Sequence, residues 1–389
     1  MVRRVKIKPW IWVLGAVVAL VLIKAVWVAV ACHSHGSFEN EKMEILNRRA
    51  YLIEKVVSTP RQLLREMPSG IDFQFKGEWA LYSCSMLTQA LVNISRLYPE
   101  TREESVGKID SLIGMVLSKD LKLYDKARWD EDPIESLNGD NSHVSYLSHL
   151  AWMIDNYRLL GGTSKYDELN DRICEAMNRR IIRSEIMNLP TYPEEDIYVP
   201  DMLVAIVALA KYQGRNDYSD TVRKWLEKAK NEWIDEKTGL LVSVLSNETG
   251  TKMFRPVKGS YSALNCYYLS MIDYEFAKEQ YGRLKSAFGQ NDWLTGLKEY
   301  HDESCLVGFD IDAGPILFNL SPSGTAFTVG SATFFDDMDF RIRLLRTAEI
   351  PGTTYTSDGK SHYILSDMAL VGEAIMLTMR THRNFAATC

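Results

Sequence analysis

The feature that most constrains this chain is an alternation of two kinds of apolar segment along residues 39–381. One kind is apolar on all sides, and the other carries apolar residues on one helical face only. A helix that is apolar all round is surrounded by protein, whereas an amphipathic helix covers a core and faces water. The segments that are apolar all round start near residues 78, 143, 200, 260, 322 and 367.

Each of these six segments is preceded by an amphipathic one, predicted at residues 39–64, 101–118, 164–183, 217–233, 273–288 and 339–347. Six inner and six outer helices in alternation predict an all-α (α/α)6 toroid of six helical hairpins over residues 37–389. An irregular α-solenoid or a two-lobed bundle is the alternative, although solenoid repeats are usually shorter, about 34–47 residues.

Two departures from this helical pattern are expected. Between 118 and 143 the sequence is polar and predicts a loop. Thr238–Leu245 and Lys252–Phe254 are rich in β-forming residues and flank a polar turn that contains glycine, which predicts a small β-hairpin insertion.

Residues 9–31 form a separate apolar segment with Lys24 as its only charge. As a helix it would be about 34 Å long, enough to cross a hydrocarbon core of about 30 Å. Trp10, Trp12 and Trp27 lie towards its ends, where indole rings favour the membrane interface. A cleaved signal peptide and, from Cys32 and the small residues before it, a lipoprotein anchor are the alternatives.

The basic segment 1–8 precedes this helix. By the positive-inside rule it predicts a single-pass protein with a cytoplasmic amino terminus and an extracytoplasmic body, periplasmic or extracellular.

Composition excludes several classes of function. A net charge of −6 argues against a nucleic-acid binder, and six widely spaced cysteines form neither a disulfide framework nor a zinc site. The chain contains no GxGxxG, GxxxxGK[ST], HExxH or GxSxG motif, so no cofactor and no metal is predicted.

In a toroid the loops that lead into the inner helices converge on one mouth, where the positive helix ends favour anionic groups. Polar residues are concentrated in those loops, among them Glu78, Tyr192 and Asp367. The predicted catalytic residues are His143, Glu195, Asp196 and Asp312. The predicted substrate-binding residues are Tyr82, Asp140, Tyr198, Asp201, Arg255, Tyr261, Asp310 and His362.

These residue types suit acid/base chemistry, since histidine titrates near neutral pH and paired carboxyl groups can exchange a proton. Structural interpretations stand beside them. Asp140 and the Asp310–Asp312 pair can cap helices or loops, and His143 can be a structural histidine. Glu195 and Asp196 can belong to a solvated charge run, Arg255 can be merely exposed, and His149 is expected in the core.

The segments YPEEDIYVPD (192–201) and DIDAGPILFNLSPSGTAFTVGSAT (310–333) resemble (α/α)6 toroid enzymes, nearest the linalool dehydratase/isomerase-like family and more distantly six-hairpin glycosidases. The resemblance covers most of residues 40–385 in architecture. In order along the chain, His143 and Tyr82 match the family's histidine and tyrosine. The cysteine pair of that family has no counterpart in the loop before residue 200.

These observations predict a membrane-anchored enzyme that acts by acid/base catalysis on a carbohydrate-like or hydroxylated small molecule or oligosaccharide, as a hydrolase, lyase or isomerase. A carboxyl group of residues 194–201 would donate the proton, and His143 or Asp312 would accept one. The alternatives are a dehydratase/isomerase of an apolar alcohol and a non-catalytic toroid that binds glycan or protein.

Overall fold

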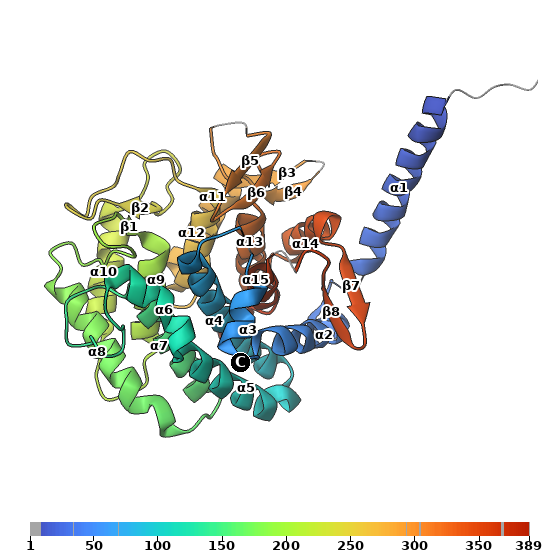
Figure 1. Cartoon of the computed structure of the whole chain (residues 1–389). Coiled ribbons are helices and arrows are strands. Elements are labelled where there is room, and N and C mark those ends of the chain that lie inside the picture. Colours follow the sequence, from blue (N-terminus) through green and yellow to red (C-terminus); the bar gives the residue numbers. More distant parts are fainter. Residues whose placement is uncertain are drawn as a thin grey trace, which may run out of the picture.

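The computed structural model describes residues 9–33, 35–68, 70–292, 294–302, 305–366 and 369–388. Within these ranges the chain forms fifteen α-helices and four two-stranded antiparallel sheets. One long helix projects from a helical body (Figure 1). The predicted mainly helical body with one N-terminal apolar helix is confirmed, whereas the basic segment 1–8 and Asp367 lie outside the described residues.

Six helices, called here the inner helices, are buried on nearly all sides. Each contacts the next along the chain, and the last contacts the first, so their contacts form a closed circuit. They are α4 (Phe73–Leu97), α7 (Val144–Leu159), α9 (Val199–Lys211), α11 (Gly259–Leu269), α13 (Pro322–Phe334) and α15 (Leu370–Arg380).

Six amphipathic helices, the outer helices, pack against this circuit. They are α2 (Phe38–Val56), α5 (Arg102–Val116), α8 (Asp167–Arg183), α10 (Ser219–Glu232), α12 (Tyr274–Phe288) and α14 (Met338–Gly352). Helix α5 contacts α4 and α7, α8 contacts α7 and α9, and α10, α12 and α14 contact α9, α11 and α13 respectively. Helix α2 contacts both α4 and α15, so it covers the place where the circuit closes.

Local sequence signals fix where several helices begin. Asp72 accepts hydrogen bonds from two backbone N–H groups of α4, and Ser321 caps α13, whose first residue is a proline. The predicted single helix 39–64 is instead two helices, because α2 ends at Val56 and Thr59 caps α3 (Pro60–Glu66). A proline cannot continue a helix that needs its N–H group.

A helix also occupies the region predicted as a polar loop. Helix α6 (Lys119–Trp129) begins after Ser118, which caps it, and contacts α4. Its buried face includes Asp125 and Arg128. Counting apolar residues fails here because charged side chains occupy part of the inward face.

The strands are short and lie in loops between helices. They are β1 (Ile197–Tyr198), β2 (Val244–Leu245), β3 (Gly289–Asn291), β4 (Thr295–Leu297), β5 (Val307–Asp310), β6 (Gly314–Leu317), β7 (Thr354–Ser357) and β8 (Lys360–Tyr363). The pairs are β1–β2, β3–β4, β5–β6 and β7–β8. Short 3₁₀ turns occur at Pro99–Thr101, Ser164–Tyr166 and Phe385–Thr388.

The predicted hairpin at 238–254 is largely wrong. Leu245 makes a single bridge to Lys252, but Val244 and Leu245 pair as β2 with the loop before α9. Ladder hydrogen bonds to a segment nearly 50 positions away thus replace the local turn. The β3–β4, β5–β6 and β7–β8 hairpins were not predicted.

A buried ion network joins α2 to α14 and α15. Its members are Glu41, Glu44, Arg48, Arg341, Glu373 and Arg380. Arg341 donates to both carboxylate oxygens of Glu41, at 2.6 and 2.9 Å. Both side chains are fully buried, so each charge depends on its partner for the solvation that water would supply.

Helix α1 (Pro9–Ala31) is long and apolar enough to cross a membrane. Its last two turns lie against α14, where the Lys24 ammonium donates to the Thr353 hydroxyl. Lys24, Val28 and Ala31 are partly covered, whereas the described side chains before Lys24 are exposed.

Candidate functional site

Seven of the carboxyl and tyrosine residues before or within the inner helices form one contiguous group. We call it the tyrosine–carboxylate cluster: Glu78, Tyr82, Tyr192, Tyr198, Asp201, Tyr261 and Asp312. Hydrogen bonds and ring contacts join five of these residues and, separately, Tyr82 with Asp201, and the charge of Glu78 acts on Asp201 across the two sets. Its members come from α4, the loop before α9, α9 itself, α11 and the turn between β5 and β6. These segments meet only in the folded chain.

Asp201 is the most perturbed carboxyl group of the cluster. The Tyr82 hydroxyl donates to one of its oxygens at 3.0 Å, and the Thr191 hydroxyl donates to the other at 2.5 Å. Burial, and after it the negative charge of Glu78, raise the pKa of Asp201 from 3.8 to about 6. This carboxyl group therefore carries a proton for part of the time near neutral pH.

Glu78 is the charged neighbour of Asp201 and is itself fully bonded. The Arg128 guanidinium donates to both Glu78 oxygens at 3.2 and 3.1 Å, and the Ser145 hydroxyl donates at 2.8 Å. Arg128 also lies 4.0 Å from the centre of the Tyr192 ring. This fork holds the Glu78 carboxylate in one orientation beneath Tyr192.

Three tyrosines form a row that connects Glu78 with Asp312. The ring centres of Tyr192 and Tyr198 are 6.1 Å apart, and those of Tyr198 and Tyr261 are 6.2 Å apart, both edge to face. Such contacts fix the ring planes and leave aromatic faces and hydroxyl groups beside the carboxyl groups.

The far end of the row is a second carboxyl–tyrosine pair. The Tyr261 hydroxyl donates to Asp312 at 2.6 Å. Burial raises the pKa of Asp312 although this bond opposes the rise. Burial would also raise the pKa of Asp310, but the ion pair with Lys258 at 2.5 Å lowers it overall. The pKa values of the two predicted aspartates are thus shifted in opposite directions.

His143 lies apart from this cluster. Its Nδ1 is 2.6 Å from buried Asp125, its Nε2 is 3.1 Å from Glu131, and the side chain is fully buried. Its backbone φ of 49° is left-handed. While these bonds hold, neither ring nitrogen is available to a substrate.

The remaining predicted residues, from the loops before α7, α9 and α11, form ion pairs of their own or are exposed. Arg255 pairs with Asp196 at 3.0 Å, and Glu195 is exposed. Asp140 is also exposed and pairs with Arg183 at 3.1 Å. None of these contacts joins the tyrosine–carboxylate cluster.

His362 lies on β8, on another part of the body. Its ring stacks on Tyr51 with centres 4.2 Å apart, and its Nδ1 is within hydrogen-bond distance of the Tyr363 carbonyl and the Ser366 hydroxyl. The structure therefore does not bring His362 together with Asp201 or Asp312.

An aromatic layer of His149, Trp152 and Tyr268 lies next to Tyr82. The ring of His149 is 4.2 Å from that of Tyr82, and Trp152 connects it to Tyr268 at 5.9 Å. His149 is fully buried, as predicted, and burial lowers its pKa to about 3, so the imidazole is neutral. His149 Nε2 and the Tyr268 hydroxyl make no hydrogen bond with the described part of the chain.

Sequence reasoning missed several residues that complete the site. Arg128 and Ser145 hold Glu78, and Thr191 bonds Asp201. Arg128 lies in the region predicted as a loop, and no signal marks it out from the charged residues around it. Glu78 and Tyr192 were placed at the mouth by their positions but were not among the predicted site residues.

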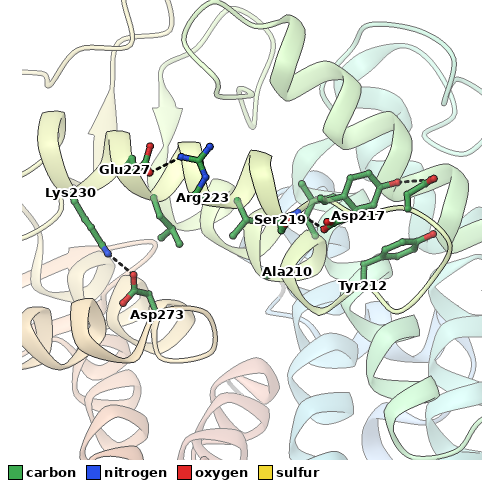
Figure 2. Close-up of a pocket in the computed structure, with 13 residues that line it drawn as sticks. Ala210, Tyr212, Asp217, Ser219, Arg223, Glu227, Lys230 and Asp273 are labelled. Carbon is green, nitrogen blue, oxygen red and sulfur yellow. Dashed lines mark hydrogen bonds and ion pairs between the residues drawn. The ribbon is translucent and has the colours of Figure 1, made fainter.

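A pocket of about 420 Å³ lies elsewhere, between the end of α9 and α10 (Figure 2). Its charged side chains bond one another: Lys230 pairs with Asp273, and Arg223 pairs with Glu227. None of the predicted site residues lines this pocket.

No protein-family model matches this chain. The assignment of function therefore depends on the chemistry of the residues themselves.

Proposed function

We propose that the chain is a membrane-anchored enzyme that uses the tyrosine–carboxylate cluster for acid/base catalysis on a hydroxylated substrate. The observation that carries the proposal is Asp201, a partly buried carboxyl group with a pKa of about 6 beside a second carboxyl group. The pKa of a carboxyl group is raised in this way in enzymes that use the group as a general acid.

We propose further that the body is an (α/α)6 toroid. The closed circuit of contacts among the inner helices and the outer position of the amphipathic helices support this architecture. The same circuit supports a common mouth, because five inner helices or their preceding loops contribute to the cluster or to its bonds.

In the proposed reaction, protonated Asp201 donates its proton to an oxygen of the substrate. Tyr82 and Thr191 then bond the resulting carboxylate, so the proton leaves a group whose charged form already has two donors. Asp312, at the other end of the tyrosine row, accepts a proton from a substrate hydroxyl or from water. The tyrosine rings offer stacking surfaces for a sugar.

A second candidate is a dehydratase/isomerase of an apolar alcohol. Trp152, Tyr268 and neutral His149 next to Tyr82 favour it, because they form an aromatic layer with unbonded polar atoms adjacent to the acid. A toroid that binds glycan without turnover is the non-catalytic alternative.

The test uses the full chain in detergent micelles with two sets of compounds. The first set, 4-nitrophenyl glycosides and uronic-acid oligosaccharides, tests carbohydrate chemistry. The second, linalool, tests the dehydratase/isomerase candidate. We expect turnover of one set, lost by at least about a hundredfold in Asp201→Asn, with kcat/KM falling as pH rises above about 6. Asp140→Asn is the matched control, since Asp140 is exposed outside the cluster. Equal turnover by Asp201→Asn and the original chain would remove Asp201 from the mechanism.

We propose that α1 is an uncleaved single-pass anchor, with residues 1–8 cytoplasmic and the body extracytoplasmic. The length and apolar character of α1 and the basic residues before it support this orientation. Protease added to spheroplasts, whose outer barrier has been removed, should digest the body, and protection of the body there would reverse the orientation.

A further inference from the structure

Helix α1 does not stand clear of the body along its whole length. Lys24, Val28 and Ala31 lie on one helical face, at spacings of four and three residues, and each is partly covered. The Lys24 ammonium bonds Thr353 at the end of α14. The last two turns of α1 therefore run beside the junction of α14 and β7.

The length of α1 then determines how deep in the bilayer that junction would lie. The part before Lys24, residues 9–23, is about 22 Å of helix at 1.5 Å per residue. A hydrocarbon core of about 30 Å needs roughly five residues more. The missing length has to come from residues 24–31, which are apolar after Lys24 and whose outward side chains Val26 and Val30 are exposed.

The body beside those turns has an apolar surface of its own. Its exposed side chains come from the last turn of α14, from β7 and from the residues after β8. They are Ile350, Tyr355, Ile364 and Leu365, each at least 42% exposed. Backbone hydrogen bonds from Ile364 to Gly352 and Thr353 hold this edge against the residue that Lys24 bonds.

Charged residues flank the apolar edge, as they would where a protein surface passes from the acyl chains to the headgroups of a bilayer. Arg343 and Arg346 are exposed on the same face of α14 as Ile350, at spacings of three and four residues, and their cations suit lipid phosphates. The turn of β7–β8 carries Asp358 and Lys360, and in Figure 1 this hairpin points away from the free end of α1.

We infer that the edge of the body formed by the end of α14 and the base of β7–β8 is embedded in the lipid layer that α1 enters. The inference rests on the proposed anchor and goes beyond it, since a tethered body need not touch lipid. The occupant of this apolar edge is the acyl and headgroup region of the bilayer, continuous with the lipid around α1.

The test places the photoreactive residue p-benzoylphenylalanine at Tyr355 in the full chain, in vesicles of phosphatidylethanolamine and phosphatidylglycerol. Lipid adducts are measured by mass spectrometry after irradiation. Val18, in the middle of α1, is the control for the anchor. Phe254, fully exposed in the loop before α11, is the matched aromatic control for lipid-free surface. Ile364 is a second test position should the change at Tyr355 disturb folding.

We expect adducts at Tyr355 or Ile364 within about threefold of those at Val18 and at least about tenfold above those at Phe254. Adducts at Val18 with only the Phe254 level at Tyr355 and Ile364 would overturn the embedded edge and leave the anchor intact. Adducts at none of these positions would overturn both.

Discussion

Replacing Asp201 by asparagine tests the physical basis of the proposed site independently of any substrate. The folded protein raises the pKa of Asp201 from 3.8 to about 6, mainly through burial. Because the folded state binds this proton more tightly than the unfolded state, the contribution to stability is complete below pH 3.8 and is lost as pH rises through 6. At pH 8 the ionised group costs about 3 kcal/mol.

Asparagine stays neutral at every pH and so does not pay this cost. One of its hydrogen-bonded neighbours, Tyr82 or Thr191, must turn to meet an amide N–H, which costs about 1 kcal/mol at all pH values. We therefore expect Asp201→Asn to be about 2 kcal/mol more stable than the original chain at pH 8. Near pH 4 the two should be nearly equal.

The assay is urea unfolding of the full chain in detergent micelles at pH 4 and pH 8, followed by circular dichroism. The decisive quantity is the change with pH in the difference between variant and original chain, because all other titrating groups cancel in that difference. For Asp140→Asn, at an exposed carboxylate, the difference in unfolding free energy from the original chain should be the same at pH 4 and pH 8. A variant that loses stability relative to the original chain as pH rises would refute the reasoning.

Two further predictions concern the fold. Arg341→Ala leaves the Glu41 carboxylate buried without its partner and should lower the free energy of unfolding by about 3–5 kcal/mol, whereas exposed Arg343→Ala should change it little. Gly259→Ala places a Cβ 1.9 Å from a backbone carbonyl oxygen and should destabilise α11 by about 1–3 kcal/mol, whereas Gly282→Ala, with open space around it in α12, should stabilise slightly. Denaturant unfolding of each pair measures the difference, and equal values within either pair would contradict the packing described.

The sequence predicted the inner helices well because a helix buried on every side needs apolar or small residues on all of its faces. Helix α9 starts within one residue of the predicted position, since apolar residues follow Pro200 without a polar face. Helix α6 was missed for the opposite reason: its inward face carries Asp125 and Arg128, which are satisfied by distant partners that a local pattern does not reveal.

The site was predicted in part for related reasons. Tyr82 and Asp201 were both expected at the mouth, but the hydrogen bond between them joins residues 119 positions apart and depends on how α4 meets α9. His143 was placed correctly at the start of α7, yet its left-handed backbone aims the ring at Asp125. The direction of a side chain at a helix start depends on backbone angles that neighbouring residues alone do not determine.

The ion network that fastens α2 has a consequence for the order in which the protein can fold. Glu41 lies ten residues after the end of α1, while its partners Arg341 and Arg380 are 300 and 339 positions later. During synthesis α2 emerges early, and Glu41 has neither of its arginine partners until nearly the whole chain has followed. Closing so long a loop is slow, because the chain loses conformational entropy before the ion pairs that stabilise the closed loop can form. The first helix of the body is therefore among the last to take its final place.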